Sequence, residues 1–247
     1  MQLFKMEYYY VSEDDVNLKD KTLIVKGEEY KHLSKILGKK IGEEITFTDG
    51  KGAIYESIVV HISKTLIECH IININKVIND TELKLILICS PLKNPSRFEF
   101  LIEKAVELGV DKILPVISDN TVVKAAFSKE KLKRLNKISQ VSSLLSQRCY
   151  FPKIENSISF KDMLSKTSKS VNKIFMYEFA DSGKNNALSI NPTNEIYVLI
   201  GPEGGFSKRE VELLEENEWQ VHSLGDRKVR AETAAIISVY KILNKFY

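Results

Sequence analysis

The sequence is poor in cysteine, histidine and tryptophan, and its apolar residues never form a long run. Cys69, Cys89 and Cys149 are too few and too far apart for a disulfide framework or a four-ligand zinc site, which indicates a reducing compartment. The four histidines are scattered, so no metal site is predicted. Apolar runs such as 85–89 and 196–200 are too short to cross a bilayer, and the first residues lack the apolar segment of a secretion signal. We therefore expect a cytoplasmic protein that binds neither metal nor membrane.

Charge alone does not identify a partner. The formal net charge is +3. Residues 1–80 hold 11 Lys/Arg and 13 Asp/Glu, whereas residues 81–247 hold 25 and 20. A mildly basic second part fits a polyanionic partner, but it equally fits an ordinary soluble enzyme.

Residues 1–75 have the pattern of a small β domain. Segments rich in Ile, Val and Thr predict strands at 22–25, 44–48, 53–62 and 65–74. The turn Asp49-Gly50-Lys51-Gly52 joins two of them as a hairpin, because glycine tolerates positive φ. One helix is predicted at 28–37 and ends at Gly38. Short strands with a single helix favour a compact barrel, and the polar stretch 75–81 marks its boundary.

Residues 80–247 alternate between strands and helices. The pattern predicts strands at 83–89, 112–117, 173–178, 195–200 and 220–224. It predicts helices at 97–108, 129–145, 208–217 and 231–246, and a loop at 181–194. This alternation is typical of an α/β domain with a mainly parallel sheet covered by helices.

A glycine-rich segment follows the strand 196–200. It reads Ile200-Gly201-Pro202-Glu203-Gly204-Gly205-Phe206-Ser207, and Ser207 with Glu210 forms a capping box that starts the next helix. Backbone without side chains can approach a ligand closely. The spacing differs from dinucleotide and P-loop motifs, so this segment alone fits a ligand-binding loop or an ordinary turn equally well.

A second segment repeats this arrangement at 224–235. Leu224-Gly225 ends a strand, three cations follow at Arg227, Lys228 and Arg230, and Glu232-Thr233 fall in the first turn of the last helix. The functional interpretation is a site that combines backbone donors, an arginine for an anionic group and an acid that handles a proton. The alternative is a basic loop before a capped helix.

Together the two segments resemble the RsmE family of bacterial small-subunit rRNA uridine-N3 methyltransferases, within the SPOUT superfamily. The matching residues are Ile200 to Ser207 and the pattern Leu224-Gly225-x-Arg227-x-x-Arg230-x-Glu232-Thr233-Ala234. Further agreement lies at Lys93, Arg97, Glu103 to Gly109, Ser118, Val122 to Lys124, His32-Leu33, Gly42-Glu43 and Phe47 to Gly50. The resemblance thus covers nearly the whole chain.

The resemblance implies an α/β fold in two parts. These are a PUA-like RNA-binding β-barrel over 1–75 and a SPOUT methyltransferase domain over 80–247 with a C-terminal trefoil knot. It further implies a homodimer and S-adenosylmethionine as cofactor. The cofactor-binding residues expected from it are Leu199, Ile200, Gly201, Glu203, Gly204, Gly205, Leu224, Gly225, Val229, Arg230, Thr233 and Ala234.

The implied reaction is methylation of N3 of a uridine in 16S rRNA, with the small ribosomal subunit as partner. Arg230 and Glu232 are the expected catalytic residues: Arg230 stabilises the uracil anion or a nearby phosphate, and Glu232 orders the loop or relays the proton. The expected RNA-binding residues are Lys31, Lys35, Lys93, Arg97, Lys124, Arg148 and Arg227.

Several positions depart from the family pattern. Asn120 stands where an arginine is usual, and Leu144-Leu145 replace a Glu-Gln pair. These departures keep open a SPOUT enzyme that acts on another nucleotide, or an assembly factor without activity. The apolar face of the last helix is a candidate dimer surface, or it is buried within its own subunit. Its members are Ala235, Ile236, Val239, Ile242 and Leu243.

Overall fold

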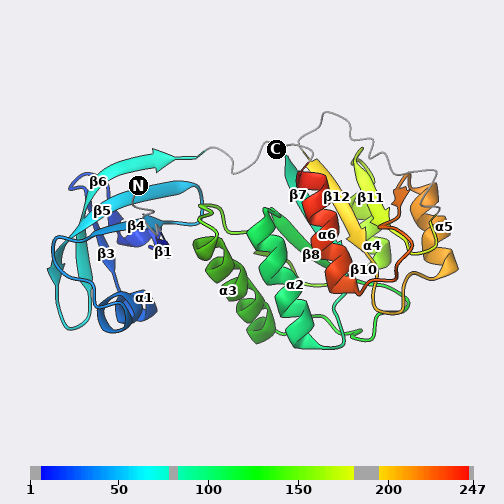
Figure 1. Cartoon of the computed structure of the whole chain (residues 1–247), viewed down its shortest axis with the longest axis horizontal. Helices are drawn as coiled ribbons and strands as arrows, with labels where there is room; N and C mark the ends of the chain where they lie inside the picture. The colour runs from blue at the N-terminus through cyan, green and yellow to red at the C-terminus, as the bar shows by residue number, and fades with distance from the viewer. Residues whose placement is uncertain (1–6, 78–82, 181–194, 245–247) are drawn as a thin grey trace. The chain divides into compact units, whose positions relative to one another are not determined.

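The chain forms two compact units (Figure 1). The computed structural model describes residues 7–77, 83–180 and 195–244. The first unit comprises residues 1–80 with 143–151, and the second comprises 81–142 with 152–247. Among the described residues, no helix combines the length and apolar composition that a membrane span requires.

The first unit is one sheet around one core. Its described strands follow the order β1-β4-β5-β6-β3-β2, antiparallel except for the β1–β4 pair. They are β1 (Tyr8–Tyr10), β2 (Val16–Asn17), β3 (Thr22–Val25), β4 (Glu44–Thr48), β5 (Ala53–Ile62) and β6 (Ile67–Lys76). Alternate residues such as Phe47, Val59 and Cys69 are fully buried in the common core. Helix α1 (Gly27–Lys31) continues into a π-helical turn at His32–Ile36 and buries Leu33 there.

The predicted hairpin turn is confirmed, and a distant segment packs against it. Gly50 and Gly52 have φ values of +72° and +108°. A Cβ on Gly50 would lie 2.3 Å from the Phe151 ring, so this position admits only glycine. The Tyr150 hydroxyl donates to the Val77 carbonyl at 2.7 Å. The strand and helix patterns gave no indication that residues 143–151 belong to the first unit.

The second unit is built on a parallel sheet. Among the described residues its order is β10-β8-β7-β12-β11-β13, and β9 also pairs with β8. The strands are β7 (Lys84–Cys89), β8 (Lys112–Ile117), β9 (Lys153–Ile154), β10 (Ile158–Ser159), β11 (Lys173–Met176), β12 (Glu195–Ile200) and β13 (Gln220–His222). The helices are α2 (Pro95–Leu108), α3 (Lys129–Leu145), α4 (Phe160–Lys166), α5 (Lys208–Glu216) and α6 (Ala231–Leu243), and α3 ends in residues 143–145 of the first unit.

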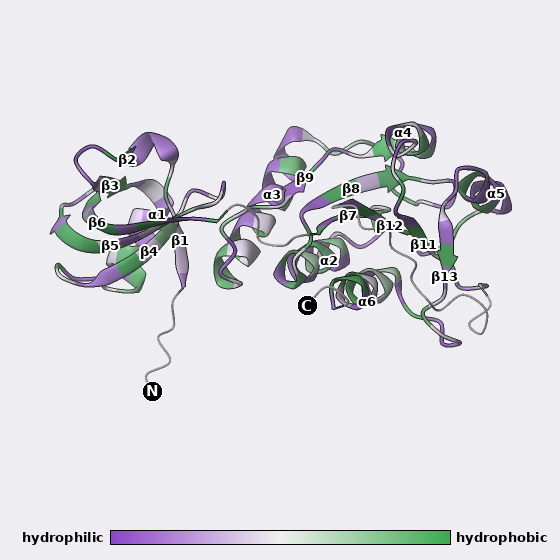
Figure 2. Cartoon of the chain, turned by 90° about the horizontal axis from the view of Figure 1, so that it is seen from above, coloured by the Kyte–Doolittle hydropathy of each residue, from purple (hydrophilic) through white to green (hydrophobic). Residues whose placement is uncertain are grey.

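The sheet separates two apolar layers. Along β7, Leu85 and Leu87 face a core shared with α2 and α6, whereas Ile86 and Ile88 face a core shared with α4 and α5. Figure 2 shows α2 and α6 on one face of the sheet and α4 and α5 on the other. The near-continuous apolar strands follow from burial on both faces.

Most predicted elements of both units are confirmed. Short elements escaped the patterns, namely β1, β2, β9, β10 and α4, because two or three residues carry no period and α4 spans only seven. The loop predicted at 181–194 lies outside the described residues.

The apolar face of α6 is mostly internal. Ala235, Val239 and Ile242 are fully buried in the core of their own unit, Leu243 is nearly so, and only Ile236 is half-buried. For these four residues the internal alternative, rather than a dimer surface, is the one the structure shows.

Neighbouring residues of α2 provide a direct test of this packing. Leu101 is fully buried between sheet and helices, whereas the Phe100 side chain is 46% exposed. We expect Leu101→Ala to lower the free energy of unfolding by about 2–5 kcal/mol through lost burial and the remaining cavity. The control Phe100→Ala should cost about 0.5–1 kcal/mol. Urea titration followed by fluorescence of the buried Trp219 measures both, and equal losses would contradict the packing described.

Candidate active-site cleft

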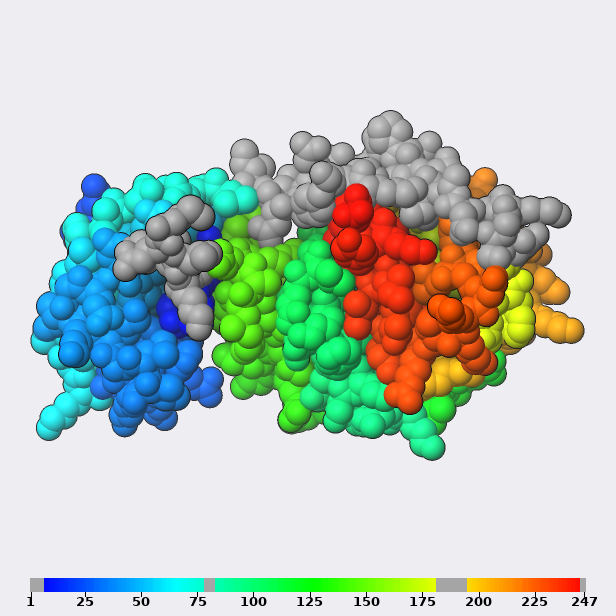
Figure 3. Space-filling view, viewed as in Figure 1, coloured from blue at the N-terminus to red at the C-terminus, as the bar shows by residue number. Residues whose placement is uncertain are grey.

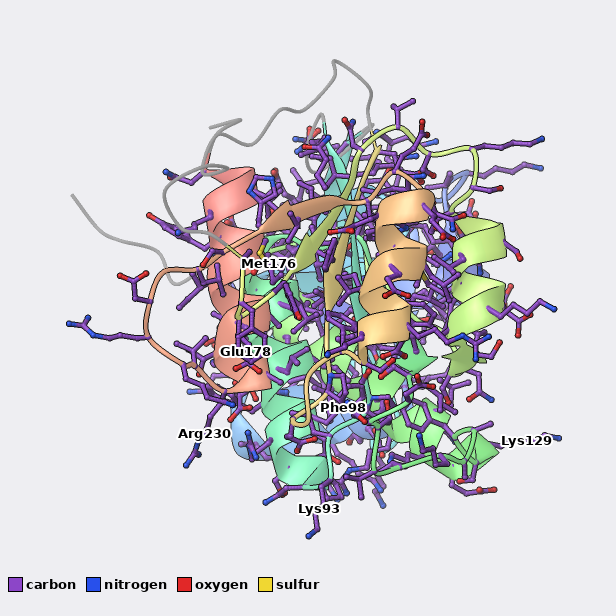
Figure 4. The ribbon with its side chains drawn as sticks, turned by 90° about the vertical axis from the view of Figure 1, so that its right-hand side faces the viewer. Lys93, Phe98, Lys129, Met176, Glu178 and Arg230 are labelled. Carbon is purple, nitrogen blue, oxygen red and sulfur yellow. The ribbon has the colours of Figure 1, made fainter. Side chains whose placement is uncertain are left out.

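A cleft of about 800 Å³ opens at the carboxyl edge of the second unit's sheet. Three chain segments line it, each at the carboxyl end of a strand: 176–179 at the end of β11, 200–206 at the end of β12 and 224–230 just after β13. The start of α6 closes one side. Figure 4 shows Met176, Glu178 and Arg230 on this side of the unit, and Figure 3 shows α6 in red beside the orange loop that precedes it. Ligands bind at this edge in open parallel sheets.

The first glycine loop is held by the helix that follows it. The Ser207 hydroxyl accepts from the Glu210 amide at 3.2 Å, and the Glu210 carboxylate accepts from the Ser207 amide at 2.9 Å. The predicted capping box is thereby confirmed. Gly205 has a φ of +70°. A Cβ on Gly204 would lie 3.0 Å from the Asn120 Cβ, so both positions favour glycine.

Residues 118–124 brace the same loop from the other side. The Asn120 amide donates to the carbonyls of Gly204 at 3.3 Å and Gly205 at 3.1 Å. The Ser207 hydroxyl donates to the Asp119 carboxylate at 2.6 Å. The family departure at Asn120 therefore contacts the glycine loop directly. The Lys124 ammonium donates a hydrogen bond to the Ser118 carbonyl at 2.9 Å. This cation, which was expected to bind RNA, therefore stabilises its own loop.

The second loop presents open backbone to the cleft. Gly225 has a φ of +107°, and no atom lies within 4 Å of the place where its Cβ would be. The Ser223 hydroxyl accepts from the Gly225 amide at 3.1 Å and fixes the turn. Arg230 is the N-cap residue of α6 in an extended conformation, and its exposed side chain lines the cleft. The loop thus combines a fixed turn with an available cation.

A charged pair joins α2 to α6 at the cleft. The Arg97 guanidinium donates from Nε to Glu232 at 2.8 Å and from Nη2 to the same carboxylate at 2.5 Å. Its Nη1 lies 3.7 Å from Glu203, which also accepts from the Lys93 amide at 3.1 Å. The hydrogen bonds from Arg97 hold the pKa of Glu232 below its usual value despite burial. Glu232 is therefore an ionised partner of Arg97, an arrangement that suits ordering better than proton relay.

Ten of the twelve expected cofactor residues line the cleft. They are Ile200, Gly201, Glu203, Gly204, Gly205, Leu224, Gly225, Val229, Arg230 and Ala234. Leu199 is instead fully buried in the core below, and Thr233 is half-buried on α6 away from the lining. Within the residues that the structure describes, no group of His, Cys, Asp and Glu is arranged to hold a metal.

Comparison with known proteins identifies the family. The profile of an RNA methyltransferase domain matches residues 79–243, and that of an RNA methyltransferase PUA domain matches residues 25–72. The chain belongs to the RsmE family of RNA methyltransferases. This confirms the family expected from the sequence.

Individual members of the family resemble the chain over most of its length. The ribosomal RNA small subunit methyltransferase E of Mesomycoplasma hyopneumoniae is 39% identical over 67% of this chain and 71% of its own. That of Bacillus subtilis is 26% identical over 90% and 89%. The crystal structure of the Neisseria gonorrhoeae protein bound to S-adenosyl methionine has a TM-score of 0.84 at 28% identity, covering 98% of both chains.

In this member of the RsmE family, the sequence patterns missed one side of the cleft. Met176, Tyr177, Glu178 and Phe179 line it from the end of β11, and Glu178 forms an ion pair with Lys228 at 3.1 Å. A strand had been predicted at 173–178, and its carboxyl end had to reach the same edge as the two glycine loops. That rule could have identified these residues.

The expected RNA-binding residues lie in different settings. Arg97 and Arg227 line the cleft, although Arg97 is engaged by Glu232. Lys31 and Lys35 are exposed on the first unit, and Lys93 is exposed just before α2. Arg148 is only 7% exposed within residues 143–151, so the structure does not support its contact with RNA.

The Arg97–Glu232 pair predicts a pH-dependent stability. The pKa of Glu232 is lower in the folded protein than in the unfolded chain, where it is about 4.3. The ionised carboxylate therefore contributes fully to the free energy of unfolding above about pH 4.3, and this contribution is lost as the pH falls through the pKa of the folded state. We expect Glu232→Gln to be less stable than wild type at neutral pH, with a difference that narrows in acid. Urea titrations across this range measure it.

Glu99 supplies the matched control. Its carboxylate forms a similar two-point pair with Arg134, whose side chain is 69% exposed. Solvent screens that pair more strongly, so Glu99→Gln should lose less stability at neutral pH. A Glu232→Gln deficit that stays constant with pH would contradict the assigned charge state.

Proposed function

We propose that the chain methylates N3 of a uridine in 16S rRNA, uridine 1498 in the standard count, using S-adenosylmethionine. The proposed substrate is the assembled small ribosomal subunit, encountered in the cytoplasm. The observation that carries this proposal is the convergence of two glycine loops on one cleft in a member of the RsmE family. The Neisseria gonorrhoeae relative was crystallised with S-adenosyl methionine bound, which supports the choice of cofactor.

The cleft fits S-adenosylmethionine in size and chemistry. Its volume of about 800 Å³ lies in the range of about 300–1,000 Å³ that is usual for small-molecule sites. Backbone around Ile200, Gly201, Leu224 and Gly225 offers hydrogen-bond groups for an adenine, and the open space at Gly225 leaves room for one. When bound, the cofactor supplies a methyl group activated by its sulfonium.

We assign Arg230 to contact the uracil that is methylated. Uracil N3 is a poor nucleophile while it carries its proton, so the site must favour the anion. Arg230 lines the cleft, and no ion pair engages it within the described part of the chain. Its guanidinium can stabilise negative charge on the uracil or on a neighbouring phosphate. Glu232 is assigned to hold Arg97 and the start of α6.

Binding of RNA is assigned to exposed cations of both units. Lys31 and Lys35 lie on the unit that matches the PUA profile, and Lys93 and Arg227 lie on the methyltransferase unit. Such cations position the RNA through its phosphates. The barrel closure of the PUA-like unit and the trefoil knot of the SPOUT domain are part of the proposal.

We also propose a homodimer, through the outer side of α6. Most of the apolar face of this helix is internal, but its Tyr240 side chain remains 54% exposed. Tyr240→Glu should shift the sedimentation coefficient from dimer toward monomer, because a buried charge opposes association. The control Val171→Glu introduces the same charge at an apolar residue that is 53% exposed and precedes β11, outside α6. A monomeric wild type would overturn the proposal.

Arg230→Ala tests the assignment of the reaction. Transfer of labelled methyl groups to small subunits from bacteria lacking this methylation should fall on the order of 100-fold or more, the loss typical of a removed charge-stabilising group. Arg230 was also expected to bind the cofactor, so calorimetry with S-adenosylmethionine separates the two roles: a nearly unchanged affinity is expected because its side chain is assigned to the substrate. Lys241→Ala, an exposed cation on the same helix, is the control. Normal transfer by Arg230→Ala would remove its assigned role.

Mass spectrometry of the product rRNA identifies the target. A single methyluridine at the proposed position, formed on subunits but not on free rRNA, is the expected result. A methyl group on another nucleotide would give the enzyme a different target, and cofactor binding without transfer would make the protein an assembly factor.

A further inference from the structure

A row of aromatic rings leads from the core of the second unit to the cleft. Phe175 on β11 is fully buried, Tyr177 follows two residues later, and Phe179 is 76% exposed. Ring centroids are 6.2 Å apart in the first pair and 5.5 Å in the second, which meets edge to face at 72°. After β11 the chain forms a turn, in which the Ala180 amide donates to the Tyr177 carbonyl at 3.3 Å, and this turn brings Phe179 against Tyr177.

The last ring of this row lies among cations. Phe179 lines the cleft together with Arg227, Lys228 and Arg230. Lys228 is paired with Glu178, whereas no ion pair holds Arg227 or Arg230 within the residues described. A single exposed phenylalanine is common on protein surfaces. Phe179 differs because its ring contacts Tyr177 at the lining of a cleft and because the neighbouring loop is positively charged. Unpaired nucleotides bind where an aromatic ring can stack on the base and nearby cations neutralise the phosphates of the RNA.

We propose that Phe179 is a stacking platform for an unpaired base of the RNA substrate, with Arg227 neutralising an adjacent phosphate. This rests on the proposed function, since it takes RNA as the substrate. The high exposure of Phe179 favours a substrate base over the cofactor adenine, which the glycine-loop backbone would enclose deeper in the cleft. A base drawn out of its stack must regain stacking energy on the protein, and a fixed aromatic face supplies it.

Phe179→Leu tests stacking apart from apolar burial. Leucine keeps an apolar side chain but lacks a flat ring face. With full-length protein, the dissociation constant for a short fluorescent oligouridine should rise on the order of 10-fold, in line with the contribution of one stacked base. The dissociation constant for S-adenosylmethionine should stay unchanged. The control Phe100→Leu alters an exposed phenylalanine of α2 outside the cleft and should leave both constants unchanged.

Phe179→Trp gives a direct signature of stacking. The chain has one tryptophan, Trp219, which is 3% exposed and provides a constant background. The variant should bind oligouridine at least as tightly as wild type, and its added emission should be quenched on binding. Emission of wild type should not change.

Three outcomes would overturn the proposal: equal oligouridine affinity for Phe179→Leu and Phe100→Leu, tight binding by Phe179→Trp without quenching, or weakened cofactor binding alone. Binding is measured without turnover. If methyl transfer to 16S rRNA fails while the Phe179 variants behave as expected, the stacking site stands and only the proposed reaction is lost.

Discussion

The arrangement of the cleft depends on the ion pair between Arg97 of α2 and Glu232 of α6. Two hydrogen bonds connect these side chains, and Glu232 is buried with only 7% of its surface exposed. A charge buried to this degree is tolerated only with a well-placed partner. The pair holds the first turn of α6, and Arg230 stands at the N-cap position of this helix. The position of the cation assigned to the substrate is thus set by a contact between helices far apart in sequence.

A second set of contacts acts on the other wall of the cleft. Asn120 and Asp119 bind the loop around Gly204 and Ser207 from the segment after β8. A loop held through its carbonyls and its capping residue keeps its amides and its outer surface in one geometry. Preorganised backbone of this kind binds a ligand without a large ordering cost. Both walls of the cleft are therefore held in a defined geometry. An ion pair holds the second loop, and hydrogen bonds from Asp119 and Asn120 hold the first.

Much of the fold could be predicted from the sequence, because the period of its apolar residues follows directly from burial. Strands such as β5 and β12 and helices such as α3 were found nearly to the residue. The capping box at Ser207 and the turn at Gly50 were also evident, since both depend on residues close together in the chain. Ten of the twelve residues that the family motifs suggest for cofactor binding line the cleft.

The sequence by itself determined the local elements, the two glycine turns and the family, because each is specified by neighbouring residues or by a motif. Only the tertiary structure decided the partner of Glu232, the brace from Asn120 and the burial of Arg148, since each depends on a residue far along the chain. It also brought the end of β11, with Glu178 and Phe179, to the two glycine loops. Strand order in a parallel sheet is set by packing between distant segments, and no periodicity along the chain encodes it.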